Sequence, residues 1–194
     1  DAKLMCLAEH KLGRAKGALN ALCLTLGTGV GGGIIAEGEL YRGSDNAAGE
    51  VGHMPINSGG RRCNCGGRGC LEAYVGNRRI ESEARKVFKR PVSLEELSHL
   101  ANVRDRRALG VWRKAGKDLG VALCGVVNLL NPERIVIGGG VAQAGKVLFD
   151  KIKETVSQQA MGVQARRVRI VKSKLGKDAG LIGAAVMVRE GLRI

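Results

Sequence analysis

Three cysteines lie within eight residues, at Cys63, Cys65 and Cys70, and this cluster constrains the fold more than any other sequence feature. The glycines between them allow the backbone turns that bring three thiolates around one point. A structural zinc site needs four ligands in a tetrahedral arrangement, and His53, ten residues upstream of Cys63, supplies the fourth. The spacing therefore predicts a structural Zn²⁺ held by these four side chains. The alternative is a redox-active or simply buried thiol cluster.

The other three cysteines, Cys6, Cys23 and Cys124, lie in apolar segments and are expected in the core. No secretory pattern is visible at the N-terminus, so six cysteines indicate a reducing, cytoplasmic compartment and a metal rather than disulfides. No apolar run is long enough to span a membrane. The longest, over 119–130, fits a buried helix, so no membrane partner is expected.

The net charge of +14 is compatible with nucleic acid, an anionic ligand or a solvated basic surface. The basic residues are densest over 78–90 and 166–174, and neither patch is interleaved with aromatic residues, which favours a solvated surface. The leucine spacing over 93–116 also permits a helix-turn-helix. Ordinary helix packing explains the same leucines, and no wing or dimer element accompanies them, so nucleic acid is not an expected partner.

The hydrophobic pattern predicts an α/β fold with a mixed sheet and flanking helices in a single domain over 1–194, because a hairpin precedes alternating strands and helices. Strands are expected at 21–26, 134–139 and 167–171, with a hairpin over 31–43 that turns near Glu37–Gly38. Helices are expected at 2–13, 71–89, from 93, about 106–130, 141–160 and 178–191, and 44–70 is loop-like. Ser93 with Glu96 forms a capping box pattern, and Asp178 is expected to cap the last helix.

Two glycine-rich turns each follow a predicted strand. The first contains Gly27, Thr28 and Gly29, whose backbone N–H groups and threonine hydroxyl could cradle phosphate oxygens. The second, around Gly138 and Gly139, opens a helix and suits the adenosine or ribose side of a nucleotide. Both turns also have a purely structural interpretation, as a hairpin turn and as tight strand–helix packing.

Two glutamates flank the predicted zinc ligands: Glu50 precedes His53 by three residues, and Glu72 follows Cys70 by two. A metal that pins this loop would hold both carboxylates in place, where they could accept hydrogen bonds from sugar hydroxyls. Taken singly, each would be an ordinary surface acid.

Taken together, LGTGVGGGIIAEGELYRGSDNAAGEVGH and CNCGGRGCLE closely resemble the ROK family of bacterial repressors and sugar kinases, and NLLNPERIVIGGGV and KDAGLIGAAVMV resemble its later segments. The match runs across essentially the whole chain. The resemblance implies an RNase H-like fold of the actin, hexokinase and sugar kinase superfamily. The spacing from His53 through the three cysteines agrees with the zinc site of that family.

The resemblance also implies roles for single residues. Glu50, His53 and Glu72 would contact the sugar, the GTG turn would face the phosphates of ATP, and the GGG turn would lie by the adenosine. The start DAKLMCLAEH resembles the Asn-Asp-Ala-Asn helix start of the family, which makes Asp1 the catalytic base. The chain departs from that pattern: no asparagine precedes Asp1, and Lys3 replaces the second one. The family's upstream phosphate and Mg²⁺ loop is also missing.

The expected function is therefore that of the second, C-terminal lobe of an ATP- and Mg²⁺-dependent sugar kinase acting on a hexose or N-acetylhexosamine. The first lobe is absent, so the chain alone is expected to be inactive or very weak. The alternative is the sugar-sensing effector domain of a ROK transcriptional repressor. A homodimer formed through this lobe is also expected from the resemblance.

Overall fold

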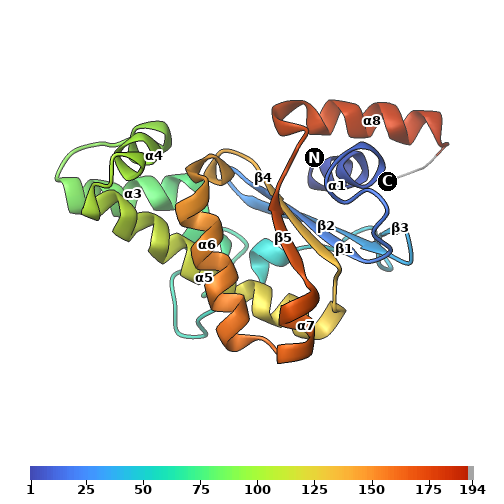
Figure 1. Ribbon diagram of the computed structural model, residues 1–194, viewed down its shortest axis with the longest axis horizontal. Helices are drawn as coiled ribbons and strands as arrows, with labels where there is room; N and C mark the ends of the chain where they lie inside the picture. Colours follow the sequence, from blue (N-terminus) through green and yellow to red (C-terminus); the bar gives the residue numbers. More distant parts are fainter. Residues whose placement is uncertain (192–194) are drawn as a thin grey trace.

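The computed structural model describes residues 1–191 and shows a five-stranded mixed sheet with helices on both faces (Figure 1). The strands are β1 (Ala21–Leu26), β2 (Val30–Ala36), β3 (Glu39–Tyr41), β4 (Arg134–Gly138) and β5 (Arg169–Lys172). Their order is β3-β2-β1-β4-β5; β2 is antiparallel to both β1 and β3, whereas β1, β4 and β5 run parallel. The predicted α/β class, mixed sheet and hairpin are confirmed.

Eight α-helices lie within the described residues 1–191. They are α1 (Ala2–Leu12), α2 (Glu72–Val75), α3 (Asn77–Phe88), α4 (Leu94–Asn102), α5 (Arg106–Leu130), α6 (Lys146–Gln159), α7 (Gly162–Arg167) and α8 (Ala179–Arg189). Three short 3₁₀ turns join them: η1 (Val51–His53), η2 (Val141–Ala144) and η3 (Gly176–Asp178). Within this part of the chain, no helix has the length and apolar character needed to cross a bilayer.

The alternation of side chains along β1 divides the interior between the two faces of the sheet. Leu22, Leu24 and Leu26 point into the larger core, which α3, α4, α5 and α6 close and which contains the fully buried Trp112. Cys23 points the other way, into a smaller core beneath α1 and α8 (Figure 1). The cysteines expected in the core, Cys6, Cys23 and Cys124, are all buried.

Two helices predicted as continuous are interrupted. The helix expected over 71–89 breaks at Gly76, whose backbone is extended and which separates α2 from α3. The segment 141–160 begins as the turn η2 and becomes α6 only after Gly145, where φ is +67°. The short helix α7 lies where no helix was expected, and β5 therefore begins at Arg169 rather than 167.

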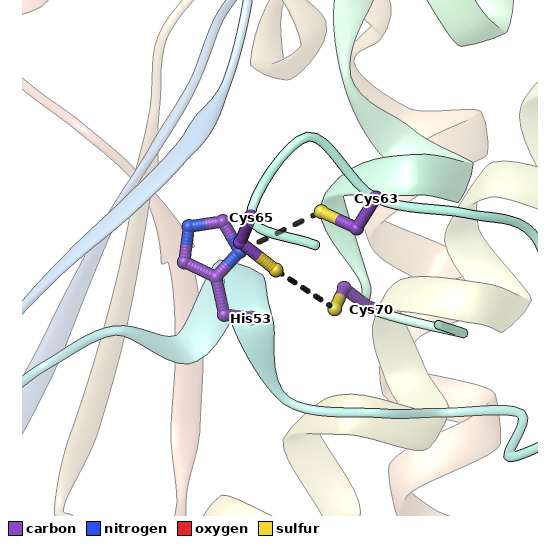
Figure 2. A group of neighbouring side chains, drawn as sticks. All are labelled: His53, Cys63, Cys65 and Cys70. Atoms are coloured by element: carbon purple, nitrogen blue, oxygen red, sulfur yellow. Dashed lines mark hydrogen bonds between the residues drawn. The ribbon is translucent and has the colours of Figure 1, made fainter. Parts of the chain in front are cut away.

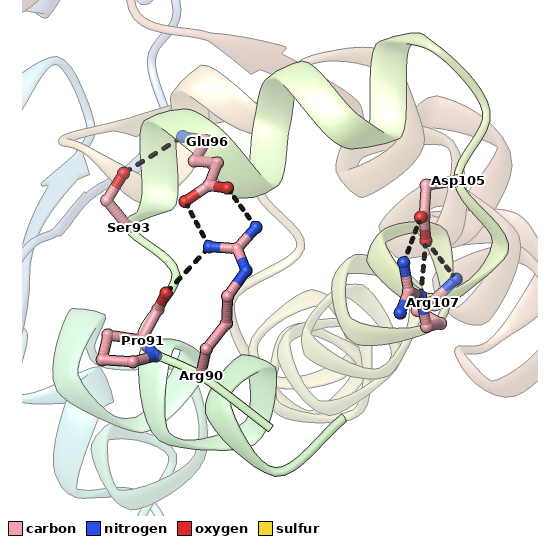
Figure 3. Close-up of polar contacts among 6 residues, drawn as sticks. All are labelled: Arg90, Pro91, Ser93, Glu96, Asp105 and Arg107. Carbon is pink, nitrogen blue, oxygen red and sulfur yellow. Dashed lines mark hydrogen bonds and ion pairs between the residues drawn. The ribbon is translucent and has the colours of Figure 1, made fainter. Parts of the chain in front are cut away.

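The predicted helix caps are confirmed in position and only partly in hydrogen bonding. The hydroxyl of Ser93 accepts a hydrogen bond from the backbone N–H of Glu96, as predicted (Figure 3). The carboxylate of Glu96 completes no capping box, because it binds the guanidinium of Arg90 through both oxygens. Asp178 precedes α8, but its side chain caps no N–H group. A cap that was not anticipated is Asp105, which accepts from two backbone N–H groups at the start of α5.

Glu9 is a fully buried carboxylate that the hydrophobic pattern did not single out. It lies near the end of α1. One oxygen accepts from the Ser173 hydroxyl at 2.6 Å and from the N–H groups of Lys174 and Leu175 at 2.9 and 3.0 Å. The other oxygen accepts from the N–H of Arg14 at 2.7 Å. This carboxylate therefore ties α1 to the segment between β5 and η3.

Candidate functional site

The structure brings the four predicted zinc ligands together (Figure 2). The donor atoms of His53, Cys63, Cys65 and Cys70 all lie within 4.8 Å of one another. The sulfurs of Cys65 and Cys70 are 3.7 Å apart, and so are Sγ of Cys63 and Nδ1 of His53. Two sulfurs bound to one tetrahedral zinc at ~2.3 Å are about 3.8 Å apart. The donor set and its spacing therefore fit zinc.

The loop achieves this arrangement through a tight turn that runs from Cys63 to Gly66 and contains Cys65. The N–H of Cys63 binds the carbonyl of Gly67, and the N–H of Gly66 binds the carbonyl of Cys63. Gly66 has a φ of +92°, in the region that favours glycine. The bridge between Pro55 and Cys70 then joins the cysteine loop to the segment after His53.

The thiols of the cluster differ in their environments. The N–H of Gly67 lowers the pKa of the Cys65 thiol, whereas removal from water raises the pKa of Cys70 to about 11. Only the thiolate is a good zinc ligand, so metal binding must displace the proton of Cys70. Zinc affinity is therefore expected to fall as the pH falls.

Each of the two predicted sugar-binding glutamates lies near one member of the cluster. Oε2 of Glu50 is 3.9 Å from Nε2 of His53, and Oε1 of Glu72 is 3.9 Å from Sγ of Cys63. Oε2 of Glu72 accepts the N–H of Val30 at 3.0 Å, directly after the GTG turn. The two carboxylates are thus joined through the cluster, Glu50 on the exposed side and Glu72 on the half-buried side.

Glu72 and Thr28 line the same cavity, of about 240 Å³. The residues around it are Thr28, Arg62, Cys63, Asn64, Glu72, Ala73, Gly76, Arg78 and Arg79. Glu50 is not among them. The cavity therefore connects the threonine of the predicted phosphate turn with one predicted sugar ligand and one predicted zinc ligand.

The two glycine turns are neighbours because they follow parallel, adjacent strands. Thr25 of β1 lies opposite Gly138 of β4, so both chains leave the sheet at the same edge. A side chain at Gly139, whose φ is +87°, would place its Cβ 2.2 Å from the carbonyl oxygen of Leu26. The carboxyl ends of parallel strands are the usual binding edge of open α/β sheets. This geometry favours one ligand that spans both turns.

Asp1 stands at the N-terminal end of α1, exposed, with no hydrogen bond from its side chain to the helix. The next residue, Ala2, packs on β2 so closely that a Cβ at Gly31 would lie 2.8 Å from it. Gly31 follows Gly29 of the GTG turn by two residues. The start of α1 is therefore beside the edge of the sheet that carries the two glycine turns.

Sequence reasoning missed the residues that hold the cysteine loop against α3. The guanidinium of Arg61 is 2.6 Å from Glu83 on α3, and its backbone N–H binds the Tyr74 hydroxyl at 3.1 Å. The Arg61 side chain also lies over the Tyr74 ring. The sequence shows only that a basic loop precedes a helix with acidic residues. This order does not identify which basic residue pairs with which acid.

The Arg61–Glu83 pair predicts a specific pH dependence of stability. The hydrogen bond from Arg61 lowers the pKa of Glu83 from 4.5 to about 2. A carboxylate with a depressed folded-state pKa stabilises the fold above pH 4.5, and this contribution disappears as the pH falls toward 2. Urea unfolding of the wild type and Glu83→Gln, both with a chelator, should differ at pH 7 and converge only as the pH falls to about 2. A difference that stays constant with pH would contradict this assignment.

Among known protein families, the family described as the ROK family matches residues 1–191 of this chain. A glucokinase from Halalkalibacterium halodurans is 38% identical over 205 residues, which cover 98% of this chain and 62% of that enzyme. The chain thus spans less than two thirds of the length of this relative.

Solved structures of two kinds share the fold. A ROK family glucokinase from Streptomyces griseus, crystallised with glucose and AMPPNP, has a TM-score of 0.90 and 29% identity over 98% of this chain and 67% of that one. A ROK family transcriptional regulator, a homologue of the Escherichia coli MLC protein, has a TM-score of 0.89 and 31% identity over 97% of this chain and half of that one.

Proposed function

Because the chain belongs to the ROK family, we propose that it forms the sugar-binding and nucleotide-binding lobe of an ATP-dependent sugar kinase. Its fold is the actin- and hexokinase-like fold of the ROK sugar kinases. The observation that carries the proposal is the shared cavity of Thr28 and Glu72, beside the four clustered donor residues. This cavity places a group suited to phosphate next to one suited to a sugar hydroxyl.

In the proposed reaction, the γ-phosphoryl group of ATP, bound with Mg²⁺, passes to a hydroxyl of a hexose or N-acetylhexosamine. Glu50 and Glu72 accept hydrogen bonds from other sugar hydroxyls and orient the ring. Nε2 of His53 faces Glu50 rather than the thiols, so it remains available to the sugar while Nδ1 faces Cys63. Asp1 accepts the proton of the attacking hydroxyl.

The remaining residues position the nucleotide. The N–H groups of the GTG turn and the Thr28 hydroxyl bind phosphate oxygens, and the turn at Gly138 and Gly139 lies against the adenosine. His53, Cys63, Cys65 and Cys70 would hold zinc, which would fix the loop between the two glutamates. A site in which all four ligands are protein atoms would activate no water. The role of zinc would thus be structural. The binding energy of the sugar and the nucleotide is used to orient the reacting groups.

A second candidate function is the effector domain of a sugar-responsive transcriptional regulator, which the likeness to the MLC homologue favours. The two functions share the sugar site and differ in the nucleotide. A kinase lobe binds ATP in competition with its analogues and shows little affinity for random duplex DNA. For either function we propose that the protein is cytoplasmic. We also propose that it forms a homodimer, and light scattering at high protein concentration would test this oligomeric state.

The kinase proposal predicts little or no turnover by the 194-residue chain itself. Phosphoryl transfer depends on groups on both sides of the reacting centre, and positioning alone contributes about 7–11 kcal/mol at the extreme. Because the chain spans 62% of the related glucokinase, we propose that transfer needs a second lobe in addition to this one. A coupled assay with ATP, Mg²⁺ and a panel of hexoses and N-acetylhexosamines measures this. Turnover near ~1 s⁻¹ that Asp1→Asn abolishes would contradict the prediction.

A further inference from the structure

Three arginines line the cavity that holds Thr28 and Glu72: Arg62 from the cysteine loop, and Arg78 and Arg79 from the first turn of α3. None of the three forms an ion pair with any residue in the described range 1–191. Two arginines nearby in the sequence do form ion pairs: Arg61 with Glu83, and Arg90 with Glu96. Three arginine side chains without a salt-bridge partner in the described part of the chain therefore line this cavity.

The one acid in this cavity does not neutralise them. Oε2 of Glu72 accepts the N–H of Val30 at 3.0 Å, and Oε1 lies near Sγ of Cys63. Three guanidinium groups and this single carboxylate line a cavity of about 240 Å³. The arginine and glutamate side chains thus leave an excess of two positive charges. Like charges that line one hollow raise its positive potential and concentrate anions there.

The chemistry of the arginine side chain narrows the choice of anion. Guanidinium groups bind phosphate oxygens through two parallel N–H bonds, more specifically than a lysine can. The cavity is smaller than the ~300 Å³ at the lower end of ordinary ligand pockets, so it suits phosphate groups rather than a whole nucleotide. Thr28, which belongs to the GTG turn, is on its wall.

We propose that Arg62, Arg78 and Arg79 bind the terminal phosphates of the nucleoside triphosphate and act as positioning residues for phosphoryl transfer. This inference rests on the proposed kinase function. Cations fixed beside the terminal phosphates offset the negative charge of the transferred group and hold it in line with the sugar hydroxyl. The basic patch over 78–90 is then partly a ligand site rather than only a solvated surface.

The test is calorimetric titration of the chain with inorganic tripolyphosphate, ATP and adenosine, each without Mg²⁺. The double variant Arg78→Gln/Arg79→Gln should weaken binding of tripolyphosphate and ATP at least about tenfold and leave adenosine binding unchanged. The charge-matched control is Arg166→Gln/Arg167→Gln on the exposed surface of α7, which should change all three affinities less than about twofold. Compared with that double variant, the variant Arg78→Lys/Arg79→Gln should recover part of the lost affinity, because lysine restores the charge at position 78 without the bidentate geometry.

Three outcomes would overturn the inference. One is the absence of measurable tripolyphosphate binding, and another is an equal loss in both double variants, which would indicate general electrostatic attraction. The third is an equal loss for ATP and adenosine, which would indicate a structural effect. Hexose binding by the same samples separates the two proposals. If hexose still binds, only the arginine assignment fails; if hexose binding is absent as well, the kinase proposal fails with it.

Discussion

Replacing Cys65 by serine is expected to reduce bound zinc from about one equivalent per chain to nearly none, with a loss of stability on the order of 3–5 kcal/mol. Cys65 is exposed, so the substitution removes almost no packing. Its effect must therefore come through the metal, because serine is a poor ligand and three donors cannot close a tetrahedral structural site. Metal analysis of protein purified without added zinc, followed by urea unfolding, measures both quantities.

The matched control for this change is Asn64→Ser, one residue away and also exposed. It should retain full zinc and full stability. A chelator should lower the stability of the wild type and of Asn64→Ser to the level of Cys65→Ser, and should not affect Cys65→Ser itself. If Cys65→Ser keeps its zinc and its stability, the four residues are a thiol cluster and not a metal site.

Glu9→Gln is the second substitution for which we expect a large effect, a loss of about 2–4 kcal/mol. The carboxylate is fully buried and accepts four hydrogen bonds, from Arg14, Ser173, Lys174 and Leu175. A glutamine has one acceptor oxygen, so its NH₂ group must face the N–H of Arg14 or the three donors on the other side. At least one of these part-buried donors then loses its partner.

Urea unfolding of Glu9→Gln against Glu39→Gln measures this cost, because Glu39 on β3 is exposed and undergoes the same chemical change. Ser173→Ala removes only one of the four donors and should cost about 1 kcal/mol. Equal stability of Glu9→Gln and Glu39→Gln would contradict the assigned role. Since Glu9 holds α1 in place, Glu9→Gln should also disturb the helix that carries Asp1.

Much of the fold could be predicted because local pattern and tertiary environment agree. β1 and α5 have the predicted bounds, since each combines a clear hydrophobic period with a clear stop, Gly27 after the strand and the left-handed Asn131 after the helix. The clustering of His53, Cys63, Cys65 and Cys70 was predictable for a similar reason. Their residue types are restricted by the metal, and the glycine turn restricts their spacing.

The parts that could not be predicted depend on contacts between distant segments. The break at Gly76 occurs where a Cβ would lie 3.0 Å from the Thr28 carbonyl, a neighbour that only the folded sheet supplies. Glu9 appeared as an ordinary polar position of an amphipathic helix, because its four donors include three from residues 173–175. The arginines around the Thr28 cavity appeared as surface charge, because sequence does not show which side chains lack counterions.

The measurement that tests the central proposal most directly is hexose binding by the zinc-loaded chain. Titration with glucose and a panel of other hexoses and N-acetylhexosamines should give saturable binding of at least one sugar. Glu72→Gln should abolish that binding without loss of zinc, whereas Glu95→Gln, an exposed acid on α4, should leave it unchanged. Absence of binding by every sugar in the panel, or equal binding by Glu72→Gln and the wild type, would contradict a sugar site at Glu72.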